Sequence, residues 1–394
     1  MKKICIVTGN DLTVPAVLGG AVEELDTILL EQNEIEKKVE FVIFTGPCKE
    51  AEEIAKNYKY SRVVYVPRDT ILEKVSNRIR RYTTKLFGLQ PGILLDSGYH
   101  RKIYKLACKE NADAYVLEGG LYHEFRRFAK KFGKEKIYFR THCHTIVEPL
   151  FDEICGNVVA VSEFSKNEWL RTSKDKSIRP YVVYNCVNEE KFKKRISAEE
   201  RKKIRESLRI GADDFVVLYC GRIQEVKGVR ELLQAFSKCQ QPNLKLLMIG
   251  NADFAVNTMT PFMKEVENLV DQDKERIRFT GYVDNSELYK YYQCADIQVM
   301  PSMWEEAAGL VAIEGMISGL PLIVTKSGGL IEYAPADVAV WVEREGIVQN
   351  LTEAISKLYG DAALREELSK KSLAHAKKFT KAGYYQNYVK VFEE

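Results

Sequence analysis

No run in this chain of 394 residues approaches the roughly 20 consecutive apolar residues that a membrane-spanning helix needs. The apolar part of the first few residues is too short for a signal peptide and instead predicts a β-strand. The formal net charge is only +3, which argues against a general nucleic-acid-binding protein. Because 45% of the residues are hydrophobic and 29% are charged, we expect a soluble globular protein of about two or three domains.

The nine cysteines are scattered along the chain, and no two of them form a Cys-x-x-Cys pair. Their odd number and wide spacing argue against a disulfide framework and against a structural zinc site. Several lie in apolar runs, where a free cysteine behaves as a small hydrophobic residue. We therefore expect a reducing compartment, which favours a cytoplasmic location.

The sequence also lacks a Gly-x-Gly-x-x-Gly motif after its first apolar run, which disfavours a nicotinamide-dependent dehydrogenase. Short apolar runs nevertheless alternate with helical patterns. This alternation predicts an α/β protein with parallel sheets covered on both faces, whose ligands bind beyond the carboxyl ends of the strands. The expected strands form two series, at residues 4–7, 41–44, 62–66, 115–117, 137–139, 158–161 and 181–184, and at residues 215–220, 245–249, 297–300, 322–325 and 338–342. Between the two series, the charged segment 188–211 is expected to connect two domains.

Residues 301–329 form the most informative stretch. Gly309 and Leu310 lie where a helix is expected to begin, and apolar residues then recur at helical spacing. The N–H groups at a helix start attract phosphate, because they lack intrahelical partners and lie at the positive end of the dipole. Glu306 lies just before this helix and Glu314 inside it, so one carboxylate can face a sugar hydroxyl and the other a ribose. The alternative is an ordinary strand–helix–strand unit with two exposed glutamates.

A second segment carries two cations after the expected strand 215–220. Gly221 lets the backbone turn after that strand, and Arg222 and Lys227 then lie at the carboxyl edge of the sheet. Two cations there can neutralise a diphosphate, on which negative charge builds up when it leaves. The alternative is a solvated basic loop.

Two further pairs of residues precede or follow expected strands of the first series. Gly19 and Gly20 allow close backbone approach to a ligand at a helix start, or they form a plain turn. His142 and His144 fall on the same face of an extended chain. Either could contact a ligand, the pair could bind a metal, and one of them could be a structural histidine.

These segments together resemble the retaining nucleotide-sugar glycosyltransferases of the GT-B fold, family four (glycosyltransferase group 1). The likeness covers nearly the whole chain and extends in general terms to bacterial capsule and cell-surface polysaccharide enzymes. It implies two Rossmann-like domains facing across a cleft, with the last helix crossing back to the N-terminal domain. On that basis we expect an acceptor-binding domain at residues 1–188, a donor-binding domain at residues 189–375 and the returning helix at residues 376–394.

The resemblance also implies roles for individual residues. Glu306 would hold the donor sugar and Glu314 the ribose, while His142 or His144 would contact hydroxyls of the donor sugar. No divalent metal or other cofactor is implied. For the diphosphate, the resemblance implies Arg222 and Lys227, the turn at Gly221 and the N–H groups near Gly309, Leu310 and Val311. The loop Gly19-Gly20 would reach toward the phosphates and the acceptor. The backbone near Val283 would hold the base, although a plain turn is an equal alternative there.

The chain departs from the family pattern after the first glutamate. Family members commonly have Phe-Gly there, whereas this chain has Ala307-Ala308-Gly309, which leaves the sugar subsite less defined. The family's Asn-Gly-Val-Asp likewise appears here with Cys186 and Asn188 in place of the glycine and the aspartate.

The implied reaction moves a hexosyl unit from a nucleotide diphosphate-sugar, with UDP favoured, to a hydroxyl of a glycan or lipid-linked glycan acceptor. The anomeric configuration would be retained, and the product would serve cell-surface polysaccharide synthesis. One alternative is a nucleotide-sugar epimerase on the same architecture. Another is a non-catalytic sugar-nucleotide-binding subunit of a transferase complex.

Two basic stretches bear on the acceptor and on location. Both interleave cations with apolar or aromatic residues, as membrane-surface helices do, although ordinary solvated faces look the same. We expect a cytoplasmic protein that can lie peripherally at the anionic inner face of the plasma membrane. The cations are Lys74, Arg78, Arg80, Arg81 and Lys85, and Arg126, Arg127, Lys130 and Lys131; the apolar residues include Ile79, Tyr82, Phe125 and Phe128.

Overall fold

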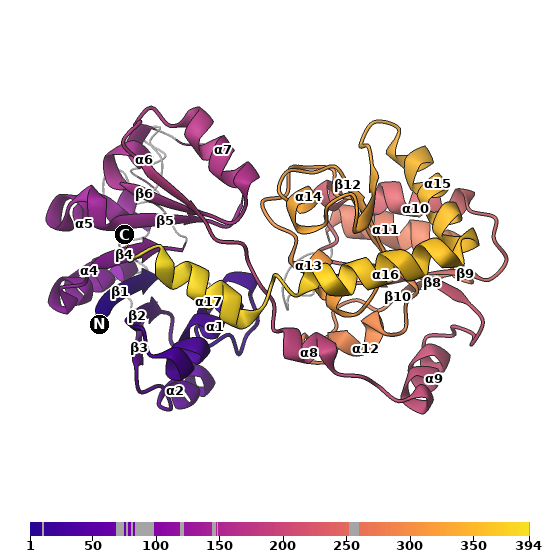
Figure 1. Ribbon diagram of the computed structural model, residues 1–394, viewed down its shortest axis with the longest axis horizontal. Helices are drawn as coiled ribbons and strands as arrows, with labels where there is room; N and C mark the ends of the chain where they lie inside the picture. Colours follow the sequence, from indigo (N-terminus) through magenta and orange to yellow (C-terminus); the bar gives the residue numbers. More distant parts are fainter. Residues whose placement is uncertain are drawn as a thin grey trace. The chain divides into compact units, whose positions relative to one another are not determined.

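The computed structural model describes residues 1–9, 12–67, 75, 78–79, 82, 98–118, 122–143, 147, 149–251 and 260–393. It divides into two compact units (Figure 1). The first unit contains Met1–Asn185 together with Lys381–Glu394, and the second contains Cys186–Thr380.

The N-terminal unit is built on a seven-stranded parallel sheet in the order β3-β2-β1-β4-β5-β6-β7. Its central strands are buried on both faces, which explains why they read as continuous apolar runs. Ile4 of β1 lies opposite Phe41 of β2 and Ala114 of β4, and this fixes the register at the centre of the sheet. The strands are β1 (Lys2–Val7), β2 (Val39–Thr45), β3 (Ser61–Tyr65), β4 (Ala114–Leu117), β5 (Ile137–Thr141), β6 (Asn157–Ala160) and β7 (Arg179–Val182).

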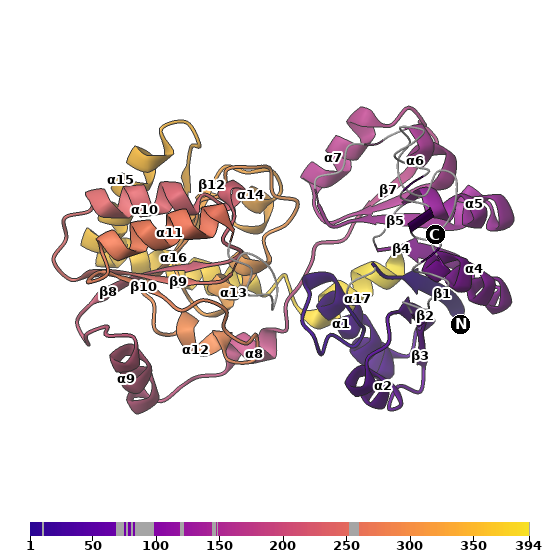
Figure 2. The same cartoon turned by 180° about the vertical axis from the view of Figure 1, so that it is seen from behind.

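The last helix of the chain belongs to this unit and packs beside α1 (Figures 1 and 2). The hydroxyl of Tyr385 donates to Oδ1 of Asn33, at 2.6 Å. The aromatic rings of this helix also pack on the sheet, as Tyr385 does against Phe41. The helices of the unit are α1 (Ala21–Glu36), α2 (Lys49–Ala55), α4 (Gly98–Glu110), α5 (Arg126–Phe132), α6 (Pro149–Ile154), α7 (Glu163–Thr172) and α17 (Lys381–Lys390).

The C-terminal unit has a six-stranded parallel sheet in the order β10-β9-β8-β11-β12-β13. Five of these strands fall where the sequence predicts them, whereas the short edge strand β10 was not expected. Arg278 lies in the middle of β10, and its Nε donates to the carbonyl of Leu208 at 2.6 Å, so a cation interrupts the apolar pattern. The strands are β8 (Phe215–Cys220), β9 (Leu244–Ile249), β10 (Ile277–Phe279), β11 (Ile297–Met300), β12 (Leu322–Thr325) and β13 (Ala339–Val342).

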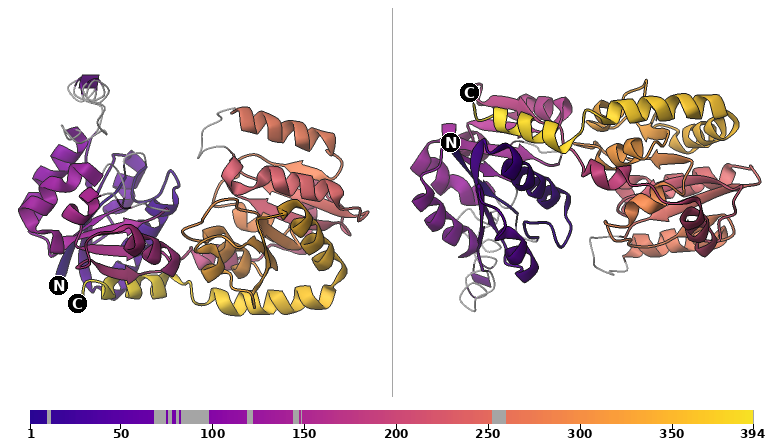
Figure 3. Two further views of the ribbon diagram at one scale, coloured as in Figure 1. Left: turned by 90° about the horizontal axis from the view of Figure 1, so that it is seen from above. Right: turned by 60° about the horizontal axis from the view of Figure 1, so that its bottom comes forward.

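Helices cover both faces of this second sheet, with α11 and α16 on opposite sides (Figure 3). Leu232, Leu233 and Phe236 of α10 are buried in the core, because its apolar residues recur on one face. The helices are α8 (Glu189–Lys193), α9 (Ala198–Ser207), α10 (Val229–Lys238), α11 (Pro261–Gln272), α12 (Leu288–Tyr292), α13 (Leu310–Ile317), α14 (Leu330–Tyr333), α15 (Ile347–Gly360) and α16 (Ala362–Ala376). The two parallel sheets confirm the expected α/β class.

The described residues contain no helix that is both long and apolar enough to cross a membrane. In the second basic stretch, on α5, the charged side chains are exposed, but Phe125 and Phe128 are buried in the core. These rings are therefore not available to enter a bilayer. In the first stretch, Arg78, Ile79 and Tyr82 are exposed, and Lys74, Arg80, Arg81 and Lys85 lie outside the described residues.

Candidate functional site

In the C-terminal unit, the predicted binding residues follow the carboxyl ends of neighbouring strands. After β8, the chain makes a short 3-10 turn (Glu225–Lys227) and enters α10 through Gly228. Gly228 has a φ of 69°, and a Cβ atom there would lie 1.9 Å from the carbonyl oxygen of Pro301. Only glycine allows this approach, which brings the loop after β8 against the loop after β11. The N–H of Met303 also joins the two loops by donating to the carbonyl of Val226, at 2.8 Å.

Lys227 and Glu306 meet across these two loops. The Nζ of Lys227 lies 2.6 Å from Oε1 of Glu306, and the same oxygen accepts from the hydroxyl of Ser302 at 2.6 Å. Lys227 also lies over the ring of Trp304, 4.9 Å from its centroid. Both charged side chains are largely buried, so each is the main neutralising partner of the other in this structure.

The end of β12 and the loop after it hold the loop that carries Glu306 in place. The Oγ of Ser327 accepts from the N–H of Glu306 at 3.2 Å, and the N–H of Gly329 donates to the carbonyl of Glu306 at 2.6 Å. Thr325 adds a third bond through its hydroxyl, which donates to the carbonyl of Ser302 at 2.8 Å. The backbone from Ser302 to Glu306 is therefore fixed by three hydrogen bonds to residues 325–329 in the ligand-free protein.

Helix α13 begins at Leu310, and Gly309 is its N-cap, as predicted. A Cβ on Gly309 would lie 2.9 Å from Cδ1 of Leu330, so close packing at the helix start explains this glycine. The first N–H groups of α13, including that of Val311, have no intrahelical partner. Within α13, Glu314 accepts at Oε2 from the hydroxyl of Tyr292, at 2.6 Å.

Arg222 and Val283 lie at the same edge of the sheet. The carbonyl of Arg222 accepts from the hydroxyl of Tyr219 at 2.7 Å, whereas its guanidinium forms no ion pair among the residues that the structure describes. Gly221, just after β8, has a φ of 156°. Val283 is half-buried in the loop after β10, where the N–H of Gly250 donates to the carbonyl of Gly281 at 2.9 Å. This edge therefore carries two cations, two carboxylates and a helix start.

In the N-terminal unit, His142 follows β5 and hydrogen-bonds through Nε2 to the carboxylate of Glu118, which follows β4. The other oxygen of Glu118 accepts from Arg140 at 3.2 Å and from the hydroxyl of Tyr388 at 3.3 Å. The carboxylate thus fixes the orientation of His142 at the carboxyl edge of the sheet. His144 lies outside the described residues.

Asp26, Glu118, Arg140, His142 and Tyr388 form a buried cluster. Burial and the charges within this cluster shift the pKa values of its members. Burial alone would raise the pKa of Glu118, but Arg140 and His142 lower it to about 2. Burial lowers the pKa of His142, so its ring favours the neutral form. Burial and then the Glu118 charge raise the pKa of Asp26, a second carboxyl 3.9 Å from Arg140, well above its usual range.

Sequence reasoning missed four members of this cluster: Asp26, Glu118, Arg140 and Tyr388. A signal existed for two of them. Arg140 directly follows the apolar run 137–139, and Glu118 directly follows the apolar run 115–117. A charge at the end of a buried strand is costly unless it is paired, so the two charges could have been read as partners.

Gly19 and Gly20 precede α1, and both have positive φ angles, 77° and 104°. Gly20 is the N-cap of α1, and the N–H of Gly19 donates to the carbonyl of Ala16 at 3.1 Å. The described residues form a turn here. They contain no group of three His, Cys, Asp or Glu side chains that could hold a metal ion.

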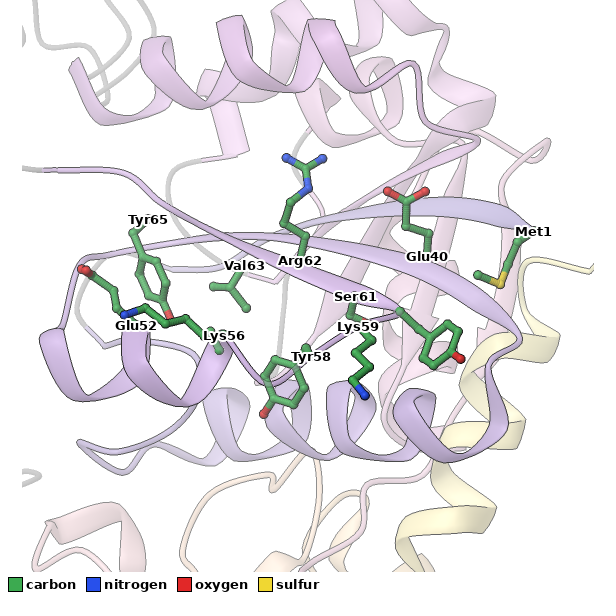
Figure 4. Close-up of a pocket in the computed structure, with 12 residues that line it drawn as sticks. Met1, Glu40, Glu52, Lys56, Tyr58, Lys59, Ser61, Arg62, Val63 and Tyr65 are labelled. Carbon is green, nitrogen blue, oxygen red and sulfur yellow. The ribbon is translucent and has the colours of Figure 1, made fainter.

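A cavity of about 690 Å³ lies beside β3 in the N-terminal unit (Figure 4). Its lining mixes cations and carboxylates, including Arg62 and Glu40, with aromatic rings such as Tyr58. Arg62 pairs with Glu110 at 2.6 Å. None of the predicted site residues lines this cavity.

Comparison with known proteins finds a family match for part of the chain and solved structures with a similar fold. Residues 200–375 match the family described as glycosyl transferases group 1. An uncharacterized glycosyltransferase of Methanocaldococcus jannaschii is 28% identical over 211 residues, 53% of this chain and 52% of that protein. A lipopolysaccharide 1,2-N-acetylglucosaminetransferase of Salmonella typhimurium is 27% identical over 195 residues, 49% of this chain and 50% of that protein. The matches thus span about half the length of these relatives.

The structure of Anabaena HepE in complex with UDP-glucose superposes with a TM-score of 0.74 and 17% identity, covering 100% of both chains. At this identity the likeness shows the fold alone, and it confirms the expected fold class, two parallel-sheet α/β domains like those of GT-B structures.

Proposed function

Because residues 200–375 match the glycosyl transferases group 1 family, we propose that the protein is a retaining hexosyltransferase. It moves a hexosyl unit from a nucleotide diphosphate-sugar, with a UDP-sugar favoured, to a hydroxyl of a glycan or lipid-linked glycan. The single observation that carries the proposal is the Lys227–Glu306 pair beside the start of α13.

In the proposed donor site, the charged side chains contact different parts of the nucleotide-sugar. Arg222, Lys227 and the N–H groups at the start of α13 stabilise the negative charge that develops on the diphosphate as the glycosidic bond breaks. Glu306 accepts from hydroxyls of the sugar, and Glu314 accepts from the ribose. When the diphosphate binds, it competes with Glu306 for Lys227, and the Glu306 carboxylate becomes available to the sugar.

We propose that His142, in the N-terminal unit, contacts a hydroxyl of the donor sugar. Glu118 accepts from Nε2–H, so the neutral ring presents Nδ1 as a hydrogen-bond acceptor. In the proposed front-face mechanism, the acceptor hydroxyl attacks the sugar from the side of the leaving phosphate. That phosphate takes the acceptor proton, so the reaction needs no separate base. No divalent metal takes part.

The acceptor belongs to cell-surface polysaccharide synthesis in this proposal. The support is the Salmonella relative, whose name makes it a lipopolysaccharide glycosyltransferase, and the exposed cations on α5. We place the enzyme in the cytoplasm, with contact to an anionic membrane surface through those cations.

A thermal-shift panel tests the donor site. Wild type and Lys227→Ala are compared with UDP, GDP, TDP and their sugars, and Lys202→Ala, an exposed lysine on α9, serves as the matched control. A ligand at a hundredfold excess over its dissociation constant stabilises the fold by about 2.7 kcal/mol. We expect a shift with one nucleotide family, lost in Lys227→Ala and kept in Lys202→Ala.

A turnover assay with the nucleotide-sugar that binds then separates the rivals. Release of nucleoside diphosphate that depends on an added glycan supports transfer. An altered sugar still attached to the nucleotide, without acceptor, would identify an epimerase. Binding without any turnover would favour a non-catalytic subunit.

A further inference from the structure

Glu314 is already held by a second side chain in the ligand-free protein. The hydroxyl of Tyr292, the last residue of α12, donates to Oε2 of Glu314 at 2.6 Å. Tyr292 is fully buried, and Glu314 is half-buried. A tyrosine hydroxyl beside a carboxylate can only donate to it, so this bond directs one oxygen of Glu314 toward α12.

The surroundings of Tyr292 hold its ring in one position. The ring of Phe192, on α8, packs edge-on against it, with centroids 5.5 Å apart and an interplanar angle of 82°. Its hydroxyl also lies within hydrogen-bond reach of Cys220, the last residue of β8. Burial, followed by the Glu314 charge, raises the pKa of Cys220 to about 12, so this thiol stays neutral. A neutral thiol is a weak acceptor, so Cys220 does not compete strongly with Glu314 for the proton of the Tyr292 hydroxyl.

A fixed carboxylate binds a ligand more tightly than a mobile one, because less side-chain freedom is lost on binding. Glu314 lies on the second turn of a helix, where a free glutamate samples several rotamers. The bond from Tyr292 removes that freedom before the nucleotide arrives.

We propose that Tyr292 is a positioning residue that orients Glu314 for the ribose hydroxyls of the nucleotide. The inference rests on the proposed function, because it assigns Glu314 to the ribose. It adds a residue from a separate helix, α12, that does not touch the ligand itself. Its effect is selective: Tyr292 strengthens binding only of ligands that carry ribose hydroxyls.

The test compares three ligands by isothermal titration calorimetry: UDP, 2′,3′-dideoxy-UDP and inorganic pyrophosphate. Tyr292→Phe removes one oxygen and leaves the buried ring in place. We expect this variant to bind UDP roughly three- to tenfold more weakly, because binding must then immobilise a Glu314 side chain that Tyr292 no longer holds. Binding of the other two ligands should change by less than about twofold, because neither presents ribose hydroxyls to Glu314.

Two controls separate positioning from a general structural effect. Tyr359→Phe removes a hydroxyl from α15 in the same unit, where the ring packs on Phe215, and should leave all three affinities unchanged. In a Glu314→Ala background, Tyr292→Phe should have no further effect on UDP binding, because the pair acts as one unit. Melting temperatures of every variant show whether the unit stays folded.

The outcomes are distinct. An equal loss of affinity for all three ligands in Tyr292→Phe, or unchanged UDP affinity, overturns the role of Tyr292 while the proposed function stands. A persisting effect of Tyr292→Phe in the Glu314→Ala background also overturns it. If folded wild-type protein binds none of UDP, GDP and TDP, the proposed function fails, and the role of Tyr292 fails with it.

Discussion

Lys227 and Glu306 neutralise each other in the absence of a ligand, with Nζ and Oε1 2.6 Å apart. Lys227, which we propose binds phosphate, is therefore already paired with Glu306, which we propose binds the sugar. Ser302 and the ring of Trp304 hold the two ends of this pair. Any diphosphate that reaches Lys227 must compete with an internal carboxylate, and this has a measurable consequence.

Glu306→Gln should separate binding of the nucleotide from turnover. The amide keeps the size of the side chain but removes the charge that competes for Lys227, so UDP should bind as tightly as in wild type or more tightly. Turnover should fall roughly ten- to hundredfold, because a charged hydrogen bond to the sugar is lost. Calorimetry with UDP and the kcat of sugar transfer check the two halves.

Lys227→Ala is the comparison for that prediction, since it should weaken UDP binding and lower turnover together. If Glu306→Gln instead loses UDP affinity as severely as Lys227→Ala does, the competition between carboxylate and diphosphate is not real.

Gly228→Ala should destabilise the C-terminal unit more than an ordinary glycine substitution. The new Cβ would lie 1.9 Å from the carbonyl oxygen of Pro301, so one of the two loops must move. Gly346→Ala is a matched control, because Gly346 has a similar φ of 66° with no atom closer than 4.0 Å to its Cβ position. The control isolates the backbone strain of a side chain at positive φ, which costs about 1–2 kcal/mol.

Thermal melts measure this difference. A loss of 1 kcal/mol lowers the melting temperature of a unit of this size by roughly 2–4 °C, and Gly228→Ala should exceed Gly346→Ala by at least that much. It should also weaken UDP binding, because Lys227 precedes the displaced residue. Equal melting temperatures for the two variants would contradict the close packing of the loops.

The sequence was sufficient for features that depend on local patterns. Short apolar runs between helical patterns predicted all seven strands of the first sheet and five of the six strands of the second, because strands buried on both faces are apolar throughout. The start of α13 at Leu310 followed from Gly309 and from the helical spacing after it. In the C-terminal unit, the strand pattern also predicted that Lys227 and Glu306 lie at the same edge of the sheet, because loops after neighbouring parallel strands meet there.

What the sequence could not provide depends on contacts between distant residues. Asp26, Glu118, Arg140 and Tyr388 come from α1, the end of β4, β5 and α17, and no local spacing relates them. Tyr292 is similar, because its bond to Glu314 joins α12 to α13. The edge strand β10 was missed for another reason, since a single arginine breaks its apolar pattern.

Asp26→Asn should stabilise the N-terminal unit at neutral and alkaline pH. Both carboxyl oxygens of Asp26 are buried, and neither has a hydrogen-bond partner among the residues that the structure describes. Burial, followed by the Glu118 charge, raises the pKa of Asp26. A carboxyl whose pKa is higher in the folded state binds protons more tightly there, so stability falls as pH rises above the unfolded pKa of about 4. The amide does not titrate and avoids this loss.

Urea denaturation at a series of pH values checks the prediction. The stability gained by Asp26→Asn over wild type should grow from pH 4 upward and level off above the folded pKa of Asp26. Asp271→Asn, at an exposed position on α11, is the control and should show no such trend. A gain that does not change with pH would mean that Asp26 is not the titrating group.

We expect membrane contact through α5 to be purely electrostatic. Arg127, Lys130 and Lys131 are exposed, whereas Phe125 and Phe128 are buried, so the helix offers charge but no aromatic anchor. Each cation near an anionic surface contributes about 1 kcal/mol, and the attraction is screened within a Debye length of about 10 Å at 0.1 M salt. Binding to vesicles with a third phosphatidylglycerol should therefore be strong at low salt and lost at 0.5 M salt.

Co-sedimentation with those vesicles measures this binding. Lys130→Glu/Lys131→Glu should abolish it at low salt, whereas Lys370→Glu/Lys371→Glu, the same charge change on exposed lysines of α16, should have little effect. Binding that survives high salt would require an apolar contact, which the buried rings of α5 cannot make. Equal loss in both double variants would mean that net charge, and not the exposed face of α5, controls the attraction.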